Sequence, residues 1–458
     1  MNGAFFGDML QSISDRGRKL LDRTWSRRPD SVTRSADFVV LCEDLLTGRG
    51  EASGVALARE ILNRYATLTT GPRVAFFEAL AQRFGPDTER MEKAVAAWQA
   101  NPNDASAAEV HHAAEPRRQE LFRRLNLAPG GTAALVRMRE QLLDAMTHRD
   151  DFKVVDADFV HLFSSWFNRG FLVLRSIDWS TPANILEKLI KHEAVHKIGS
   201  WDDLRRRIDP SDRCCFAFFH PALNDEPLIF VEVALTHDIP GAIEPILAAK
   251  RDTLEADKVD TAAFYSISNC QRGLAGVSFG NFLIKQVVEE ISKDNAKLNT
   301  FVTLSPVPGF ASWLKRERAA DSSRALTQED LDALTNLDIE GWWQVPETWE
   351  PVEEPLMRAA AWYFLHARNS RGFPADPVAR FHLGNGARLE KMHFLADSSE
   401  NGMKQSYGVM VNYLYDLDDI EKNHEAFAEN RMVVTANAIR KMARPGPTGD
   451  VVPLVNKA

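Results

Sequence analysis

Residues 264–291, "FYSISNCQRGLAGVSFGNFLIKQVVEEI", contain the three elements from which the fold of this chain is predicted. The first residues are mostly aromatic, β-branched or small, and predict a strand. Glycines 273, 276 and 280 follow, which let the backbone turn tightly and approach a ligand closely. A helix pattern then opens at Asn281. Because free N–H groups at a helix N-terminus bind anions, this order of strand, turn and helix predicts a phosphate or pyrophosphate site.

The turn itself departs from the G-x-G-x-x-G of dinucleotide-binding folds, so such a fold is not implied. It resembles the Q/R-x-x-G-x-G/A turn with which acetyltransferase-like domains hold the pyrophosphate of coenzyme A. Arg272, Ala275 and Gly276 approximate that pattern. Any tight turn can contain such residues, so the pattern gains its weight from its position between strand and helix.

Strand and helix patterns alternate on both sides of this stretch. The segments that predict strands are "FLVLRSIDW", "CCFAFFHP", "PLIFVEVALT", "TFVTLSPVPGF", "PVARFH" and "YGVMVNYLY". With the helices between them, they predict one mixed α/β domain over residues 169–458. Residues 1–168 instead show apolar residues at helical spacing between short polar or Gly/Pro breaks. We expect this region to be an all-helical bundle that serves packing or oligomerisation.

Composition excludes several classes of function. The chain has 458 residues, of which 45% are hydrophobic and 26% charged, as in ordinary globular proteins. Its net charge of -9 leaves no basic excess for neutralising phosphates, so nucleic acid is not expected as the main partner. No apolar run of about 18 residues predicts a membrane span. Four cysteines are too few and too scattered for a disulfide framework, which favours a reducing, cytoplasmic compartment.

The most conspicuous motif is "HEAVH" at residues 192–196, the spacing of a metzincin-type zinc site. A helix predicted to begin near Thr181 and to end at Gly199 would place His192 and His196 on one face. The surroundings argue against a metal, since lysines adjoin both histidines and no methionine lies between 146 and 357 to form the expected methionine turn. We therefore reject a zinc metalloprotease and predict no metal or other cofactor.

Two other segments end in residues that could carry chemistry. Ser305 is followed by Pro306 and Pro308, which fix the chain as it leaves a predicted strand. His382 is predicted to end another strand and to meet the turn Gly384-Asn385-Gly386. A turn serine that satisfies its own backbone and a structural histidine are the alternative interpretations.

Taken together, these segments resemble malonyl-CoA decarboxylases. The motifs that carry the resemblance occur in family order over roughly residues 155–415, and are "HLFSSWFNRGFLVL", "AVH", "FYSIS", "RGLAGVSFGNFLIK", "LSPVPGF", "PLMRAAAWYF", "PVARFHLGNGA" and "GVMVNYLY". The resemblance implies a helical oligomerisation domain followed by an acetyltransferase-like (GNAT-type) catalytic domain. It implies conversion of malonyl-CoA to acetyl-CoA and CO2 without metal, in a homo-oligomer that is a tetramer or a dimer.

The resemblance also assigns site residues. The family's catalytic serine and histidine fall on Ser305 and His382. Its nucleotide-binding segment falls on Ala275, Gly276, Val277, Ser278, Phe279, Gly280 and Asn281. Ser266 and Tyr415 match positions near the family's site. One departure is Ser278, where some members carry Glu, so no carboxylate role is assigned at that position.

Decarboxylation of a malonyl thioester leaves an enolate, whose charge must be stabilised by fixed hydrogen-bond donors before its carbon is protonated. We expect His382 to donate that proton. Ser305 either holds the departing carboxylate or acts as a proton acceptor paired with His382, and both roles stay open. An acyl-CoA-dependent acyltransferase and a non-catalytic CoA-binding scaffold are the alternative functions.

Overall fold

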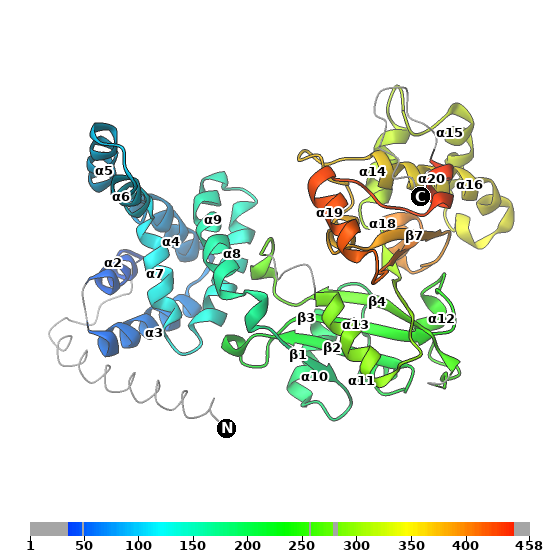
Figure 1. The fold of residues 1–458 in the computed structure, drawn as a ribbon, viewed down its shortest axis with the longest axis horizontal. Coiled ribbons are helices and arrows are strands. Elements are labelled where there is room, and N and C mark those ends of the chain that lie inside the picture. The colour runs from blue at the N-terminus through cyan, green and yellow to red at the C-terminus, as the bar shows by residue number, and fades with distance from the viewer. Residues whose placement is uncertain (1–34, 48–49, 256–257, 278–282, 444–458) are drawn as a thin grey trace. The chain divides into compact units, whose positions relative to one another are not determined.

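The computed structural model of the chain describes residues 35–47, 50–255, 258–277 and 283–443 (Figure 1). Contacts divide the chain into two compact units. The first comprises the described residues of Met1–Val173, Phe219–Glu226 and Gln271–Phe279. The second comprises those of Leu174–Phe218, Pro227–Cys270 and Gly280–Ala458. The domain limits 1–168 and 169–458 stay a prediction.

The first unit is helical, as expected, and its helices run from blue to cyan in Figure 1. They are α2 (Ser35–Leu46), α3 (Glu51–Thr67), α4 (Thr70–Arg83), α5 (Thr88–Ala100), α6 (Asp104–Ala114), α7 (Arg117–Asn126), α8 (Gly131–Met146) and α9 (Lys153–Trp166). Buried aromatic rings fill the space between them. Phe122 of α7 stacks on Phe159 of α9 with ring centroids 4.1 Å apart. Apolar area removed from water in this way is the main stabilising contribution to a small bundle.

The second unit is built on an eight-stranded mixed sheet, with strands β1–β4 side by side in Figure 1. The strands are β1 (Val173–Ile177), β2 (Arg213–Phe219), β3 (Pro227–Thr236), β4 (Thr261–Asn269), β5 (Thr300–Thr303), β6 (Ser305–Pro306), β7 (Arg388–His393) and β8 (Met410–Leu414). The order is β1-β2-β3-β4-β5-β8-β6, and β7 pairs with β8. Helices followed by a mixed sheet confirm the predicted fold class.

The helices of the second unit lie between and after these strands in the chain. They are α10 (Ala183–His192), α11 (Trp201–Ile208), α12 (Glu244–Leu247), α13 (Leu283–Asp294), α14 (Phe310–Arg318), α15 (Gln328–Leu334), α16 (Pro346–His366), α17 (Pro377–Gly384), α18 (Glu400–Ser406), α19 (Ile420–Asn430) and α20 (Asn437–Met442). In neither unit is any described helix long and apolar enough to cross a membrane.

The centre of the sheet contains an irregularity that positions Ser305. Strands β4 and β5 pair in parallel only as far as Phe264 and Thr303. Val302 of β5 also pairs with β8, and beyond β5 Ser305 and Pro306 pair with β8 alone. On the other side of β4, the register against β3 slips by one residue, so that Tyr265 is an extra residue in the strand. Ser305 therefore lies where the chain parts from β4 and stays paired with β8.

Two predictions of local structure are wrong. His382 does not end a strand, because residues 377–384 form helix α17. The side chain of Asp376 caps that helix and Pro377 occupies its first turn, which is a start signal that outweighs the short apolar run. The helix through "HEAVH" ends at His192 rather than near Gly199, so His192 and His196 do not share a helical face.

Candidate active site

Ser305 begins strand β6 and is 5% exposed. The pairing of Ser305 with Val411 holds its backbone in the sheet. The hydroxyl donates a hydrogen bond to Thr303 Oγ1, with 2.8 Å between the two oxygens. Residues two apart in an extended segment point to the same side, which is why the two hydroxyls meet. The Ser305 hydroxyl is therefore bonded to a side chain, whereas a turn serine would bond to its own backbone.

His382 lies in the last turn of α17 and is buried. Its Nε2 is 3.3 Å from Ser305 Oγ, and its Nδ1 is 2.8 Å from the Tyr415 hydroxyl. The structure thus brings together three residues assigned from the sequence. Thr303 completes this group, which we call the His382 cluster: Thr303, Ser305, His382 and Tyr415.

The hydrogen bonds of the His382 cluster have a consistent direction. A hydroxyl carries one proton, and that of Ser305 is donated to Thr303. Ser305 Oγ can then only accept from His382, which requires the proton on Nε2. Nδ1 is left as an acceptor for the Tyr415 hydroxyl. The imidazole is therefore assigned as the neutral tautomer with its N–H directed at Ser305.

Burial explains why the imidazole is neutral. Removal from water lowers the pKa of His382 to about 3, because a charged ring loses its solvation. The same effect raises the pKa of Tyr415 well above its usual value. The ring of Tyr413 stacks on His382 with centroids 4.6 Å apart. The cluster is thus an uncharged hydrogen-bonded chain inside an apolar and aromatic environment.

Strand β8 fixes the position of Thr303 in the cluster through two hydrogen bonds. The Asn412 amide donates to the backbone oxygen of Thr303 at 2.8 Å, and the N–H of Tyr413 donates to Thr303 Oγ1 at 3.1 Å. Sequence reasoning missed Thr303, Asn412 and Asp376. The first could have been found from its spacing of two residues before Ser305, and the last from the Asp-Pro helix start.

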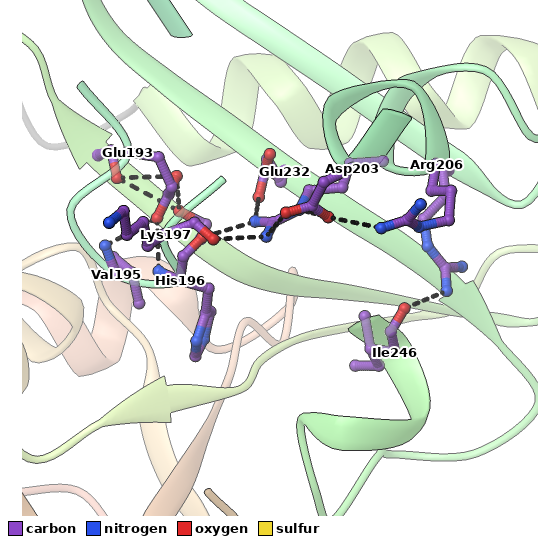
Figure 2. A network of polar contacts seen from close by, with 12 residues as sticks. Glu193, Val195, His196, Lys197, Asp203, Arg206, Glu232 and Ile246 are labelled. Atoms are coloured by element: carbon purple, nitrogen blue, oxygen red, sulfur yellow. Dashed lines mark hydrogen bonds and ion pairs between the residues drawn. The ribbon is translucent and has the colours of Figure 1, made fainter. Parts of the chain in front are cut away.

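Ser266 belongs to a different buried group. Its hydroxyl donates to Glu193 Oε2 at 2.8 Å, and Ser268 donates to the same oxygen at 3.2 Å. Glu193 Oε1 accepts from the N–H groups of Val195 and His196, both at 2.7 Å (Figure 2). We call these five residues the Glu193 cluster. None of the hydrogen bonds described for the residues of the structure joins Ser266 to Ser305 or His382.

The "HEAVH" stretch is therefore a loop anchor. Its glutamate clamps the loop that follows α10 onto strand β4. The loop is fixed further by Arg207, which donates to the backbone oxygen of His196 at 2.8 Å. Arg207 also reaches the fully buried carboxylate of Glu232 at 3.3 Å. Among the described residues, no group of three or more His, Cys, Asp or Glu side chains is arranged to hold a metal ion.

The glycine turn is described as far as Val277 and belongs to the first unit. Gly276 has a φ of 77°, a left-handed conformation that favours glycine. A Cβ on Gly273 would lie 2.0 Å from the backbone oxygen of Val136, so the turn needs glycine here for close packing as well. Ala275 lies between the two. Ser278, Phe279, Gly280 and Asn281 lie outside the described residues.

The chain matches two family models. The malonyl-CoA decarboxylase C-terminal domain matches residues 170–450, and the malonyl-CoA decarboxylase N-terminal domain matches residues 84–167. The chain belongs to the malonyl-CoA decarboxylase family. It is accordingly a carboxy-lyase enzyme, and the family expected from the sequence motifs is confirmed.

Proteins named malonyl-CoA decarboxylase are similar to this chain along most of their length. The mitochondrial malonyl-CoA decarboxylase of Anser anser anser is 35% identical over 420 residues, which cover 83% of this chain and 82% of the relative. The crystal structure of malonyl-CoA decarboxylase from Rhodopseudomonas palustris has a TM-score of 0.88 at 56% identity and covers 90% of this chain and 100% of its own. That from Agrobacterium vitis has a TM-score of 0.85 at 54% identity, covering 89% and 100%.

Proposed function

We propose that this protein decarboxylates malonyl-CoA to acetyl-CoA and CO2, without a metal or other cofactor, through Ser305 and His382. The observation that carries the assignment of residues is the hydrogen-bonded contact of Ser305 with His382, whose far side is held by Tyr415. Family membership supports the substrate.

The proposed reaction breaks the bond between the malonyl carboxyl group and the neighbouring carbon. CO2 leaves, and its electron pair remains as an enolate of the thioester. Fixed donors that face the thioester oxygen would stabilise this charge. The enolate carbon then takes a proton, which gives acetyl-CoA.

His382 supplies that proton in the proposed mechanism. The anionic malonyl group brings a negative charge to the site, and a nearby negative charge favours the protonated imidazole. Solvent therefore loads His382 with a proton when substrate is bound, and transfer to carbon returns the neutral ring found in the free protein. Tyr415 can serve both states, because a hydroxyl accepts from the charged ring as readily as it donates to the neutral one.

Ser305 has the role of orienting this transfer. Its hydroxyl donates to Thr303 and its oxygen accepts from His382 Nε2, so the side chain is fixed between the two. A hydroxyl fixed next to the proton donor can act as a proton acceptor paired with His382 or hold the departing carboxylate. Both roles predict that loss of the hydroxyl slows turnover.

The test uses purified protein with malonyl-CoA and EDTA, and follows acetyl-CoA and CO2. We expect full turnover in EDTA. Ser305→Ala and His382→Ala should each lower kcat by about a hundredfold or more, as loss of a general acid–base group does. Ser164→Ala and His111→Ala, which change exposed residues of the helical unit, serve as controls.

Other results would contradict the proposal. Normal kcat in both site variants would show that Ser305 and His382 take no part in the mechanism. Inhibition by EDTA would contradict the proposal that the reaction needs no metal. Absence of acetyl-CoA production, with transfer of the acyl group to an added amine and release of free CoA instead, would favour an acyltransferase. CoA binding with no turnover would favour a scaffold. The homo-oligomer, tetramer or dimer, and the cytoplasmic location stay predictions that sizing chromatography and cell fractionation would check.

A further inference from the structure

A buried carboxyl group lies at the start of the helix that carries His382. Asp376 is 1% exposed, and its Oδ1 accepts a hydrogen bond from the N–H of Ala379 at 2.8 Å. Its Oδ2 is buried and makes no hydrogen bond of normal geometry with the described residues. A buried acceptor without a partner is costly and needs a reason. The mechanism proposed above does not use Asp376.

Asp376 also lies close to the turn that follows Ser305. Gly309 ends that turn, and a Cβ built on it would lie 4.0 Å from Asp376 Oδ2 and 2.5 Å from the hydroxyl oxygen of Tyr363. The N–H of Ala379 donates to Oδ1, and the N–H groups of Val378 and Gly309, whose contacts lie outside normal hydrogen-bond geometry, also favour the charged form of the carboxyl. One side chain therefore faces both the helix of His382 and the chain segment of Ser305.

The charged and titratable groups that face Asp376 come from three elements. Arg380 of α17 favours the carboxylate, and its guanidinium is held beside it by the backbone oxygens of Pro374 and Ala375, each at 2.8 Å. Burial raises the pKa of Tyr363 of α16 and of Tyr413 of β8, and the Asp376 charge raises both further. Burial opposes these donors and raises the pKa of Asp376 to about 6. The group thus changes charge within the range where enzymes are assayed.

We propose that Asp376 is a positioning residue whose carboxylate form holds His382 against Ser305, by capping helix α17 while facing the turn at Gly309. The proposal rests on the function proposed for Ser305 and His382. The contact between His382 Nε2 and Ser305 Oγ, at 3.3 Å, is long for a hydrogen bond and sensitive to small shifts of α17. Protonation removes the charge that the N–H groups of the helix start favour, so the first turn of α17 is held less firmly.

The test is Asp376→Asn. The amide oxygen can still cap Ala379, but the side chain no longer titrates. In the unmodified enzyme, kcat should fall as the pH is lowered through about 6, where Asp376 gains its proton. In the variant, kcat at pH 7.5 should be about tenfold lower, the size of one lost charge-assisted hydrogen bond, with KM within about twofold. The decline of kcat near pH 6 should be absent.

Asp87→Asn is the matched control, because Asp87 caps helix α5 of the helical unit by accepting from the N–H of Arg90 at 3.1 Å. It should leave both kcat and the pH profile unchanged. An Asp376→Asn enzyme that keeps the normal kcat and the decline near pH 6 overturns the proposal. So does a variant with lower kcat but an unchanged pH profile, because this indicates a structural role only.

Failure of the proposed function gives a different result. If Ser305→Ala and His382→Ala keep normal turnover, the pair itself is not catalytic, whatever Asp376→Asn does. If Ser305→Ala and His382→Ala both lose turnover while Asp376→Asn behaves as the unmodified enzyme, the catalytic role of the pair is supported and only the positioning role of Asp376 is wrong.

Discussion

The polar side chains of the Glu193 cluster and of the His382 cluster are all buried, but the two clusters differ in what their hydrogen bonds can do. In the Glu193 cluster, all donors converge on one carboxylate, which only accepts while it is charged. In the His382 cluster, every side chain can both donate and accept. A proton that enters one end of this second chain can reverse the direction of its bonds, whereas the first chain has a fixed direction. The first cluster is therefore suited to clamping a loop, and the second is suited to moving a proton.

This comparison predicts opposite effects of mutation. Changes in the Glu193 cluster should lower stability and spare the chemical step. Changes in the His382 cluster should lower turnover and spare stability. Both clusters are in the second unit, so the same preparation can report on both.

The largest effect is expected for Glu193→Ala. The change leaves two serine hydroxyls and two backbone N–H groups without their buried acceptor. Removal of one partner from such a buried group costs about 3 kcal/mol in the free energy of unfolding. We expect the Tm to fall by several degrees in thermal unfolding, while kcat at saturating malonyl-CoA stays within about threefold.

Glu187→Ala is the control for this prediction, since Glu187 is an exposed residue of helix α10, which directly precedes Glu193. It should leave the Tm unchanged. A Glu193→Ala protein with a normal Tm and a large loss of kcat would place the Glu193 cluster in the chemistry and break the comparison. It would also give Ser266 a direct role in catalysis, beyond the contact with Glu193 that the structure shows.

A smaller effect, now on turnover, is expected for Gly309→Ala. The new Cβ would lie 2.5 Å from the Tyr363 hydroxyl, and Tyr363 is a rigid, buried side chain. The backbone after Ser305 must therefore shift, and a displacement of about 1 Å in a catalytic group lowers kcat by up to about a hundredfold.

Tyr363→Phe provides the rescue for this change. It removes the oxygen that clashes, and the next atom of the ring is 3.8 Å away, an ordinary contact. The double variant should recover most of the kcat lost by Gly309→Ala. If the double variant is as slow as the single one, the turn after Ser305 does not depend on this contact.

The local features of the fold could be predicted from the sequence, and the contacts of the site could not. Strand β4, the glycine turn and helix α13 follow from patterns that lie within about 30 residues, because alternation, glycine and amphipathic spacing act locally. The meeting of Thr303 with the N–H of Tyr413 depends on β5 pairing with β8, more than 100 residues apart in the chain. No local pattern encodes that pairing.

The two errors of local prediction have separate causes. The short apolar run at residues 377–382 predicts a strand, although Asp376 and Pro377 mark the start of the helix that carries His382. The helical spacing of the histidines in "HEAVH" predicts a helix that continues to Gly199, which is too long. Glu193 instead turns back to bond the N–H groups of the two residues that follow Ala194, which ends the helix at His192.

The smallest effect, and the sharpest test of the comparison, is expected for Tyr415→Phe. The change removes the hydroxyl that lies 2.8 Å from His382 Nδ1 and leaves the ring in place. The imidazole loses the hydroxyl that fixes its tautomer and that would accept a hydrogen bond from its charged form. We expect kcat to fall by about tenfold, equivalent to about 1.4 kcal/mol, with the Tm unchanged within a few degrees.

The control for this last prediction is Tyr265→Phe in strand β4. Tyr265 is as deeply buried as Tyr415, but its hydroxyl has no hydrogen-bond partner among the described residues, so its removal leaves no group unsatisfied. We expect normal kcat and a Tm that is unchanged or higher. Equal losses of kcat in the two variants would mean that any buried tyrosine hydroxyl in the second unit affects turnover. A loss of kcat confined to Tyr415→Phe would show that turnover depends on the hydrogen bond between Tyr415 and His382. Such a dependence of turnover on a hydrogen bond is what distinguishes the His382 cluster from the Glu193 cluster.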